Sequence, residues 1–110
     1  MQIDKRVADE KVGVLALEGR LNLVSAPSLR TAVEETVAET PHVVVDLSAV
    51  TFMDSSGLGA LIAALKKARQ AHGDLRIAGA NEQLITVLKL TNLDRVLRPY
   101  DTVEEASDGW

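Results

Sequence analysis

The stretch VVVDLSAVTFMDSSGLG, residues 43–59, contains the pattern that decides the fold. Its first residues are mostly β-branched and follow a proline, which is typical of a buried strand. Its last six residues, DSSGLG, lie where the strand-like run passes into an apolar pattern with helical spacing. Leu58, Leu61, Ile62 and Leu65 form one stripe of that pattern. The stretch therefore predicts a strand that leads directly into a helix.

Strands and helices alternate on both sides of this stretch. We expect strands at residues 3–7, 12–17 and 75–79, helices that start near Ser25, Asn81 and Thr102, and a short strand or irregular return within residues 93–100. Residues 12–17 are almost continuously apolar, so this strand is predicted to be buried on both faces. Ser25 and Asn81 are the expected N-caps, and Pro27 falls in a first helical turn, where its missing N–H costs nothing. The order predicts a single α/β domain with a mixed central β-sheet of about four to five strands and helices packed mainly on one face.

Length and composition are those of one globular domain. The chain has 110 residues, of which 46% are apolar and 25% are charged. We place the domain at residues 1–106 and expect a loose C-terminal tail at residues 107–110. A net charge of −4 and 3% aromatic residues argue against nucleic acid or a membrane as the main partner. The absence of cysteine, a leader and a long apolar span suits a cytoplasmic protein without a metal site.

The segment DSSGLG, residues 54–59, is the strongest candidate for a functional site. The first N–H groups of a helix have no internal partner, so they can be capped by a hydroxyl or can hold a phosphate. Ser55 or Ser56 could act only as an N-cap, which contributes about 1 kcal/mol. Because glycine costs roughly 1 kcal/mol relative to alanine inside a helix, Gly57 and Gly59 need a further reason. Close approach of another backbone, of a partner or of a phosphate would supply it.

Several blocks of the chain share one family resemblance. Residues 43–48 and 52–59 form its centre, residues 17–22 lie before them, and residues 75–80 and 88–93 follow. Together they resemble the STAS-domain family of anti-sigma factor antagonists, also called anti-anti-sigma factors. The resemblance covers nearly the whole chain, and the DSSGLG run in this context is a specific motif.

The resemblance implies a phosphorylation switch in a bacterial transcription regulator that is not itself an enzyme. In this family the unphosphorylated antagonist binds an anti-sigma factor that is also a serine kinase, and the sigma factor is freed. The kinase phosphorylates the serine directly after the aspartate, here Ser55, which switches binding off until a metal-dependent serine phosphatase restores it. The chain itself needs no cofactor. The partner-binding residues implied by this partner switching are Asp54, Ser56, Gly57, Leu58 and Asn22. Asn22 departs from the family, which usually has an aspartate there.

Other functions stay open on the sequence alone. A STAS domain can also bind the ATPase of a lipid-transport complex or serve as a scaffold in stress signalling. A small serine hydrolase is less favoured, because the expected layout places neither His42 nor His72 beside the serines and no nucleophile-elbow pattern is present. Asp46 could be the phosphoacceptor of a receiver domain, but that site needs an acidic pair where this chain has only Glu18. We therefore interpret Asp46 as a hydrogen-bond acceptor at a strand end.

Overall fold

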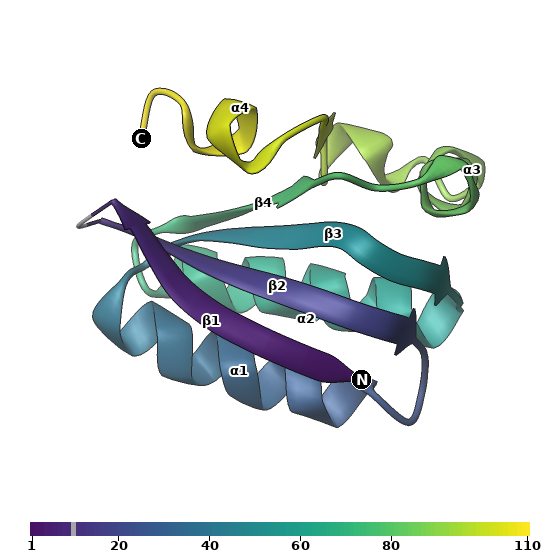
Figure 1. Ribbon diagram of the computed structural model, residues 1–110, viewed down its shortest axis with the longest axis horizontal. Coiled ribbons are helices and arrows are strands. Elements are labelled where there is room, and N and C mark those ends of the chain that lie inside the picture. The colour runs from purple at the N-terminus through teal and green to yellow at the C-terminus, as the bar shows by residue number, and fades with distance from the viewer. Residues whose placement is uncertain (10) are drawn as a thin grey trace.

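The structure, a computed structural model, describes residues 1–9 and 11–110, apart from the side chain of Asp9. Five strands form one sheet (Figure 1). In spatial order they are β1 (Gln2–Asp9), β2 (Val12–Leu21), β3 (His42–Met53), β4 (Asp74–Ala78) and β5 (Pro99–Tyr100). β1 runs antiparallel to β2, whereas all other neighbouring strands are parallel. The mixed sheet and the alternation of strands with helices confirm the predicted fold class.

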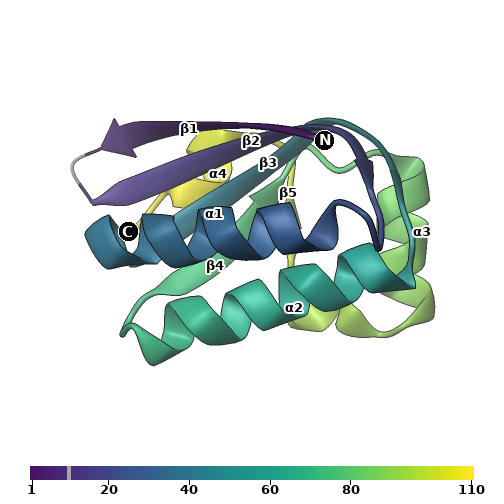
Figure 2. The ribbon, with the colours of Figure 1, turned by 90° about the horizontal axis from the view of Figure 1, so that it is seen from below.

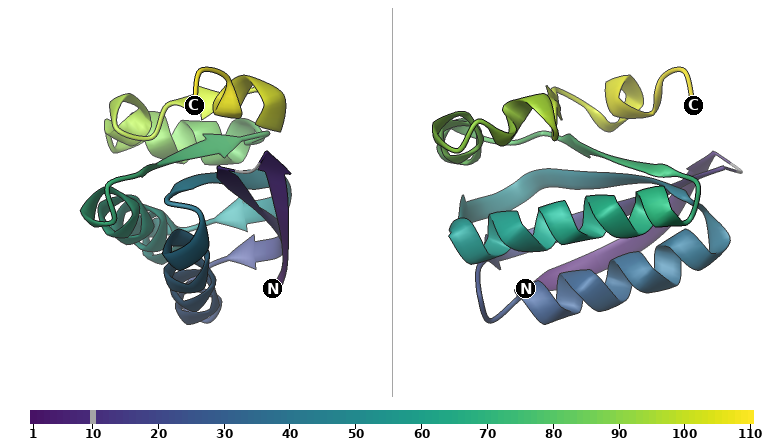
Figure 3. Two further views of the ribbon diagram at one scale, coloured as in Figure 1. Left: turned by 90° about the vertical axis from the view of Figure 1, so that its left-hand side faces the viewer. Right: turned by 180° about the vertical axis from the view of Figure 1, so that it is seen from behind.

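The two long helices cover one face of the sheet. α1 (Ala26–Glu39) and α2 (Ser55–Gln70) lie side by side on that face, as Figure 2 shows. α3 (Glu82–Leu90) lies at the end of the sheet where β3 stops, followed by the short 3₁₀ helix η1 (Leu93–Arg95). α4 (Val103–Ser107) packs on the opposite face, which both views of Figure 3 make visible. The prediction that helices pack mainly on one face is confirmed.

Both faces of the central strands are buried, which explains their continuous apolar sequence. Leu15 and Leu17 of β2 belong to the larger core beneath α1 and α2. Val12 and Val14 of the same strand belong to a smaller core beneath α4. Side chains alternate between the two faces along a strand, so a strand covered on both faces must be apolar at nearly every position. The prediction for residues 12–17 is therefore confirmed.

β3 is longer than predicted, because it continues beside β2 through residues of mixed polarity. The pairing shifts between Ala16 opposite Asp46 and Glu18 opposite Ala49. At this shift Asp46 Oδ1 accepts a hydrogen bond from the Ser48 backbone N–H at 3.0 Å. The interpretation of Asp46 as a hydrogen-bond acceptor is confirmed, but its placement at a strand end is wrong. β3 continues to Met53 and so carries the DSSGLG segment past the last pairing with β4.

The last residues pack on the domain, so the expectation of a loose tail is wrong. Ser107 still belongs to α4. The Trp110 ring lies 4.9 Å from the His42 ring, measured between centroids. The Arg76 guanidinium carbon lies 4.1 Å from the Trp110 centroid, close enough for a cation–π interaction. The contact was missed because it joins residues far apart in the sequence. Within residues 1–9 and 11–110, no helix has the length and apolar character needed to cross a membrane.

Candidate functional site

The start of α2 is capped by Asp54 and not by either serine. Asp54 has an extended backbone, and its Oδ1 accepts a hydrogen bond from the Gly57 backbone N–H at 2.8 Å. The Asp54 carbonyl accepts the next one, from Leu58 N at 3.0 Å. The carboxylate also lies at the positive end of the helix dipole, which favours an acid over a hydroxyl at this position. Of the two interpretations that the sequence left open for Ser55 and Ser56, the one that makes a serine the N-cap is therefore wrong.

This cap leaves both serines in the first turn of α2 without a capping role. Ser55 is the first helical residue and is exposed to solvent, whereas Ser56 is partly buried. Their own backbone N–H groups belong to the first turn, in which intrahelical partners are lacking. A phosphate on Ser55 would therefore lie beside free N–H donors at the positive end of a helix.

Gly57 is required because the first turn of α2 packs directly on the end of β2. A Cβ atom at Gly57 would overlap the Leu21 carbonyl group. The same carbonyl accepts a hydrogen bond from Asp54 N at 3.2 Å, and Leu21 pairs with Met53 in the sheet. This geometry confirms that another backbone approaches Gly57 closely. Gly59 differs, because it is exposed and a Cβ there would meet nothing within 4 Å.

The loop after Leu21 is shaped by Asn22. Its Oδ1 accepts hydrogen bonds from the backbone N–H groups of Val24 at 3.1 Å and Ser25 at 3.2 Å. Ser25 Oγ donates to the Arg20 carbonyl at 2.8 Å, and it accepts from Asn22 N at 2.9 Å. Ser25 does precede α1, as predicted, but its side chain makes no capping bond and stabilises the loop instead. A carboxylate at position 22 could accept the same bonds, so the amide preserves the loop.

The Asn22 loop presents two apolar side chains that the sequence reading missed. Leu23 is 72% exposed and Val24 is 87% exposed. They lie in the loop that joins β2 to α1, and this loop passes beside the start of α2 (Figure 2), where Leu21 packs against Gly57. The sequence feature that could have revealed this contact site is a pair of adjacent apolar residues in a short loop. Exposed apolar side chains that gather at one place on a surface indicate a contact site for a partner.

Gln83 of α3 holds the strand end that precedes Asp54. Its Oε1 accepts from Met53 N, and its Nε2 donates to the Met53 carbonyl, both at 3.0 Å. No local pattern could reveal this pair, because thirty positions separate the two residues. The structure therefore brings three segments together: the Asn22 loop, the start of α2 and the start of α3.

Two of the predicted partner-facing residues point inward. Gly57 is buried, and Leu58 is only 3% exposed within the larger core. These two residues position the turn, whereas Asp54, Ser55 and Ser56 keep accessible surface. The accessible part of the site is therefore polar at the helix and apolar at the neighbouring loop.

Neither histidine lies near the serines. His42 begins β3, and Ser55 follows the far end of that strand. His72 follows α2, whose 16 residues span about 24 Å from Ser55 onward. The arrangement thus provides no histidine base for a serine nucleophile. In the part of the chain that the structure describes, no group of three or more His, Cys, Asp or Glu side chains could hold a metal ion.

Known proteins resemble this chain in sequence and in fold. Residues 2–106 match the STAS domain. The anti-sigma-F factor antagonist RsfB of Mycobacterium tuberculosis is 34% identical over 105 residues, which cover 94% of this chain and 85% of RsfB. A candidate anti-sigma factor antagonist of Thermotoga maritima is 40% identical over 62 residues, which span 56% of this chain and only 55% of that relative. The crystal structure of TM1081, also a candidate antagonist from Thermotoga maritima, superimposes with a TM-score of 0.85 at 30% identity, covering 94% of this chain and 90% of TM1081.

Proposed function

This chain belongs to the STAS-domain family of anti-sigma factor antagonists, and on that premise we propose that it works as a phosphorylation-controlled partner switch. Its unphosphorylated form binds an anti-sigma factor serine kinase in the bacterial cytoplasm and frees a sigma factor. Phosphorylation of Ser55 by that kinase ends the binding, and a metal-dependent serine phosphatase restores it. The observation that carries the proposal is the exposure of Ser55 at the start of a helix that Asp54 already caps.

The position of Ser55 suits a switch that acts on binding rather than on folding. A phosphate adds about −1.5 to −2 charges at neutral pH. The N-terminus of α2 favours that charge, so the domain itself tolerates it. A partner that covers Ser55 would instead have to bury the phosphate beside the Asp54 carboxylate. Repulsion and desolvation then weaken the complex while the domain stays folded.

The apolar part of the proposed contact is the pair Leu23 and Val24. Both side chains lie largely in solvent, so they contribute little to the stability of the isolated domain. Full burial of an aliphatic side chain against a partner is worth about 1.5–3 kcal/mol. Asn22 contributes to the site indirectly: its side chain fixes the backbone of this loop through the hydrogen bonds that it accepts from Val24 and Ser25.

We expect the double variant Leu23→Asp/Val24→Asp to bind the anti-sigma factor at least about 100-fold more weakly, the loss produced by roughly 2.7 kcal/mol. Its thermal unfolding should stay close to that of the wild type, because neither side chain packs in the core. Isothermal titration calorimetry and circular dichroism measure the two effects. Leu90→Asp is the matched control, because Leu90 is 79% exposed at the far end of α3. If both variants lost affinity equally, the Asn22 loop would not be a specific part of the contact.

The function itself is tested by capture of partners from a lysate of the source cell, followed by mass spectrometry with phosphosite mapping. We expect a kinase-fold anti-sigma factor on the wild-type bait and, after addition of ATP, a phosphate on Ser55. Capture of a transporter ATPase without modification of Ser55 would favour the lipid-transport function instead. Recovery of the chain only in large assemblies would favour the scaffold. Labelling of Ser55 or Ser56 by a serine-reactive phosphonate would favour a hydrolase.

A further inference from the structure

β1 forms an edge of the sheet that the rest of the described chain leaves open. Its one neighbouring strand is β2. Every residue from position 4 to position 8 is exposed, and Val7 is 54% exposed. An edge strand presents a row of backbone N–H and C=O groups that can pair with another strand. The strand that fits this edge can be identified from its charges.

The sequence of β1 is complementary to itself when two copies run antiparallel. In one continuous sheet, residues directly opposite each other lie on the same face, so odd positions pair with odd and even with even. In a register centred on Lys5, the two Lys5 residues lie opposite each other. On each side of this centre, Asp4 of one copy then lies opposite Arg6 of the other, and Ile3 lies opposite Val7. The next allowed registers place Asp4 opposite Asp4, or Arg6 opposite Arg6. Opposite charges stabilise a cross-strand pair and like charges destabilise it, so the charges select one register.

The lysine at the centre of this register already forms an ion pair with a carboxylate of its own chain. A lysine on an edge strand normally discourages pairing. Here Lys5 Nζ lies 2.8 Å from Glu39 Oε2 at the end of α1. The hydrogen bond to Lys5 and the Lys5 charge lower the pKa of the Glu39 carboxyl group, so the ion pair persists to more acidic pH than an unpaired glutamate would allow. Two Lys5 side chains that meet at the centre therefore each bring their own counterion.

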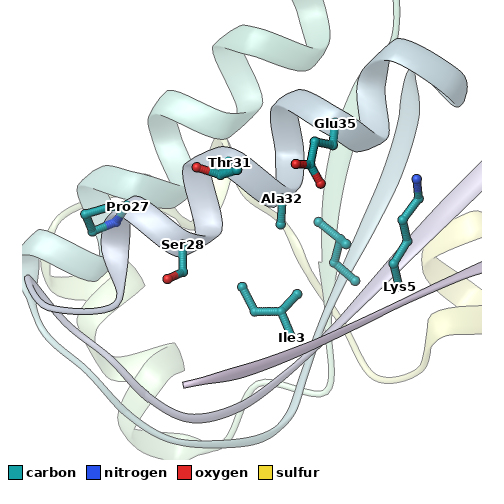
Figure 4. Close-up of a pocket in the computed structure, with 8 residues that line it drawn as sticks. Ile3, Lys5, Pro27, Ser28, Thr31, Ala32 and Glu35 are labelled. Atoms are coloured by element: carbon teal, nitrogen blue, oxygen red, sulfur yellow. The ribbon is translucent and has the colours of Figure 1, made fainter.

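The two faces of β1 carry different parts of the proposed contact. Figure 4 shows Ile3 and Lys5 on the side of α1, where they line an open groove of about 480 Å³. Arg6 and Ala8 lie on the opposite face and line a hollow beside α4. The apolar pairs of the register thus lie next to the grooves, and the Asp4–Arg6 pairs lie on the α4 face.

We propose that two copies of this chain associate through antiparallel pairing of their β1 strands, centred on Lys5. The pairing joins the two five-stranded sheets into one. The two-fold axis passes between the β1 strands, so the Ser55 sites of the two copies lie at opposite ends of the joined sheet. This contact is separate from the start of α2, and the dimer leaves both Ser55 residues open to a partner.

A charge-swap series tests the register. Sedimentation velocity and light scattering on the full chain, over a concentration series into the millimolar range, should show a wild-type dimer. Asp4→Arg alone and Arg6→Asp alone should each be monomeric at the same concentrations, because each puts like charges opposite each other twice. An equimolar mixture of the two variants should dimerise again, because one chain is then basic at both positions and the other acidic at both.

The double variant Asp4→Arg/Arg6→Asp should also dimerise, because the exchange preserves the complementarity. Arg30→Asp is the matched control, an exposed arginine of α1 away from this edge, and it should leave the dimer intact. Circular dichroism confirms that all variants fold. A wild-type chain that stays monomeric throughout the series overturns the proposal. A dimer that survives both single swaps overturns it as well, because another surface must then form the contact.

Discussion

Ser55→Asp is expected to reduce the affinity for the anti-sigma factor by roughly 100-fold or more while the domain stays as stable as the wild type. Truncated or unpaired charges in protein interfaces typically cost about 2–5 kcal/mol, which covers this range. Within the domain the new carboxylate lies at the first position of α2, where the helix dipole contributes about 0.3–1 kcal/mol in its favour. The affinity for the anti-sigma factor should therefore fall, while the free energy of unfolding of the domain stays the same or rises slightly.

Calorimetry with the purified anti-sigma factor and chemical denaturation of the free chain measure these two quantities. Ser55→Ala is the matched control: it should bind like the wild type and accept no phosphate at position 55. Ser55→Asp should also fail to release the sigma factor from its complex. If Ser55→Asp binds as tightly as Ser55→Ala, a negative charge at this position does not control the partner, and the switch proposed for Ser55 is wrong.

Gly57→Ala is expected to lower the free energy of unfolding by about 1–3 kcal/mol, near the upper end of that range. The added Cβ would overlap the Leu21 carbonyl, which belongs to the paired end of β2 and cannot move without disturbing the sheet. Urea denaturation measured by circular dichroism gives the value. A change in the midpoint without a change in slope identifies a true loss of stability.

Gly59→Ala is the matched control for Gly57→Ala, two positions further along the same helix. Its Cβ meets nothing, so we expect a gain of up to about 1 kcal/mol from the higher helix propensity of alanine. Lower affinity of Gly59→Ala for the anti-sigma factor would show that the partner backbone approaches this position. Equal stability of Gly57→Ala and the wild type would contradict the close packing of α2 on β2.

Local chemistry made much of the fold predictable. Asn81 was recognisable as an N-cap because its Oδ1 needs to reach only Leu84 N, three residues away and 3.0 Å distant. The apolar run at residues 12–17 was readable as a doubly buried strand because side-chain alternation is a property of the strand itself. The DSSGLG motif and its flanking blocks identified the family, because the residues of each block are consecutive in the sequence and can be recognised without the structure.

Contacts between distant segments decided what the sequence left open. The cap of α2 falls on Asp54 because β3 extends to Met53, and that length depends on pairing with Leu21. The same neighbour makes Gly57 necessary, while Gly59, two positions further along the same helix, faces solvent. Trp110 likewise packs on a strand that begins at His42. The sequence by itself determined the order of elements and the motif, since both depend on spacing along the chain. Only the tertiary structure decided which side chains cap, pack or stay exposed, since that depends on neighbours remote in sequence.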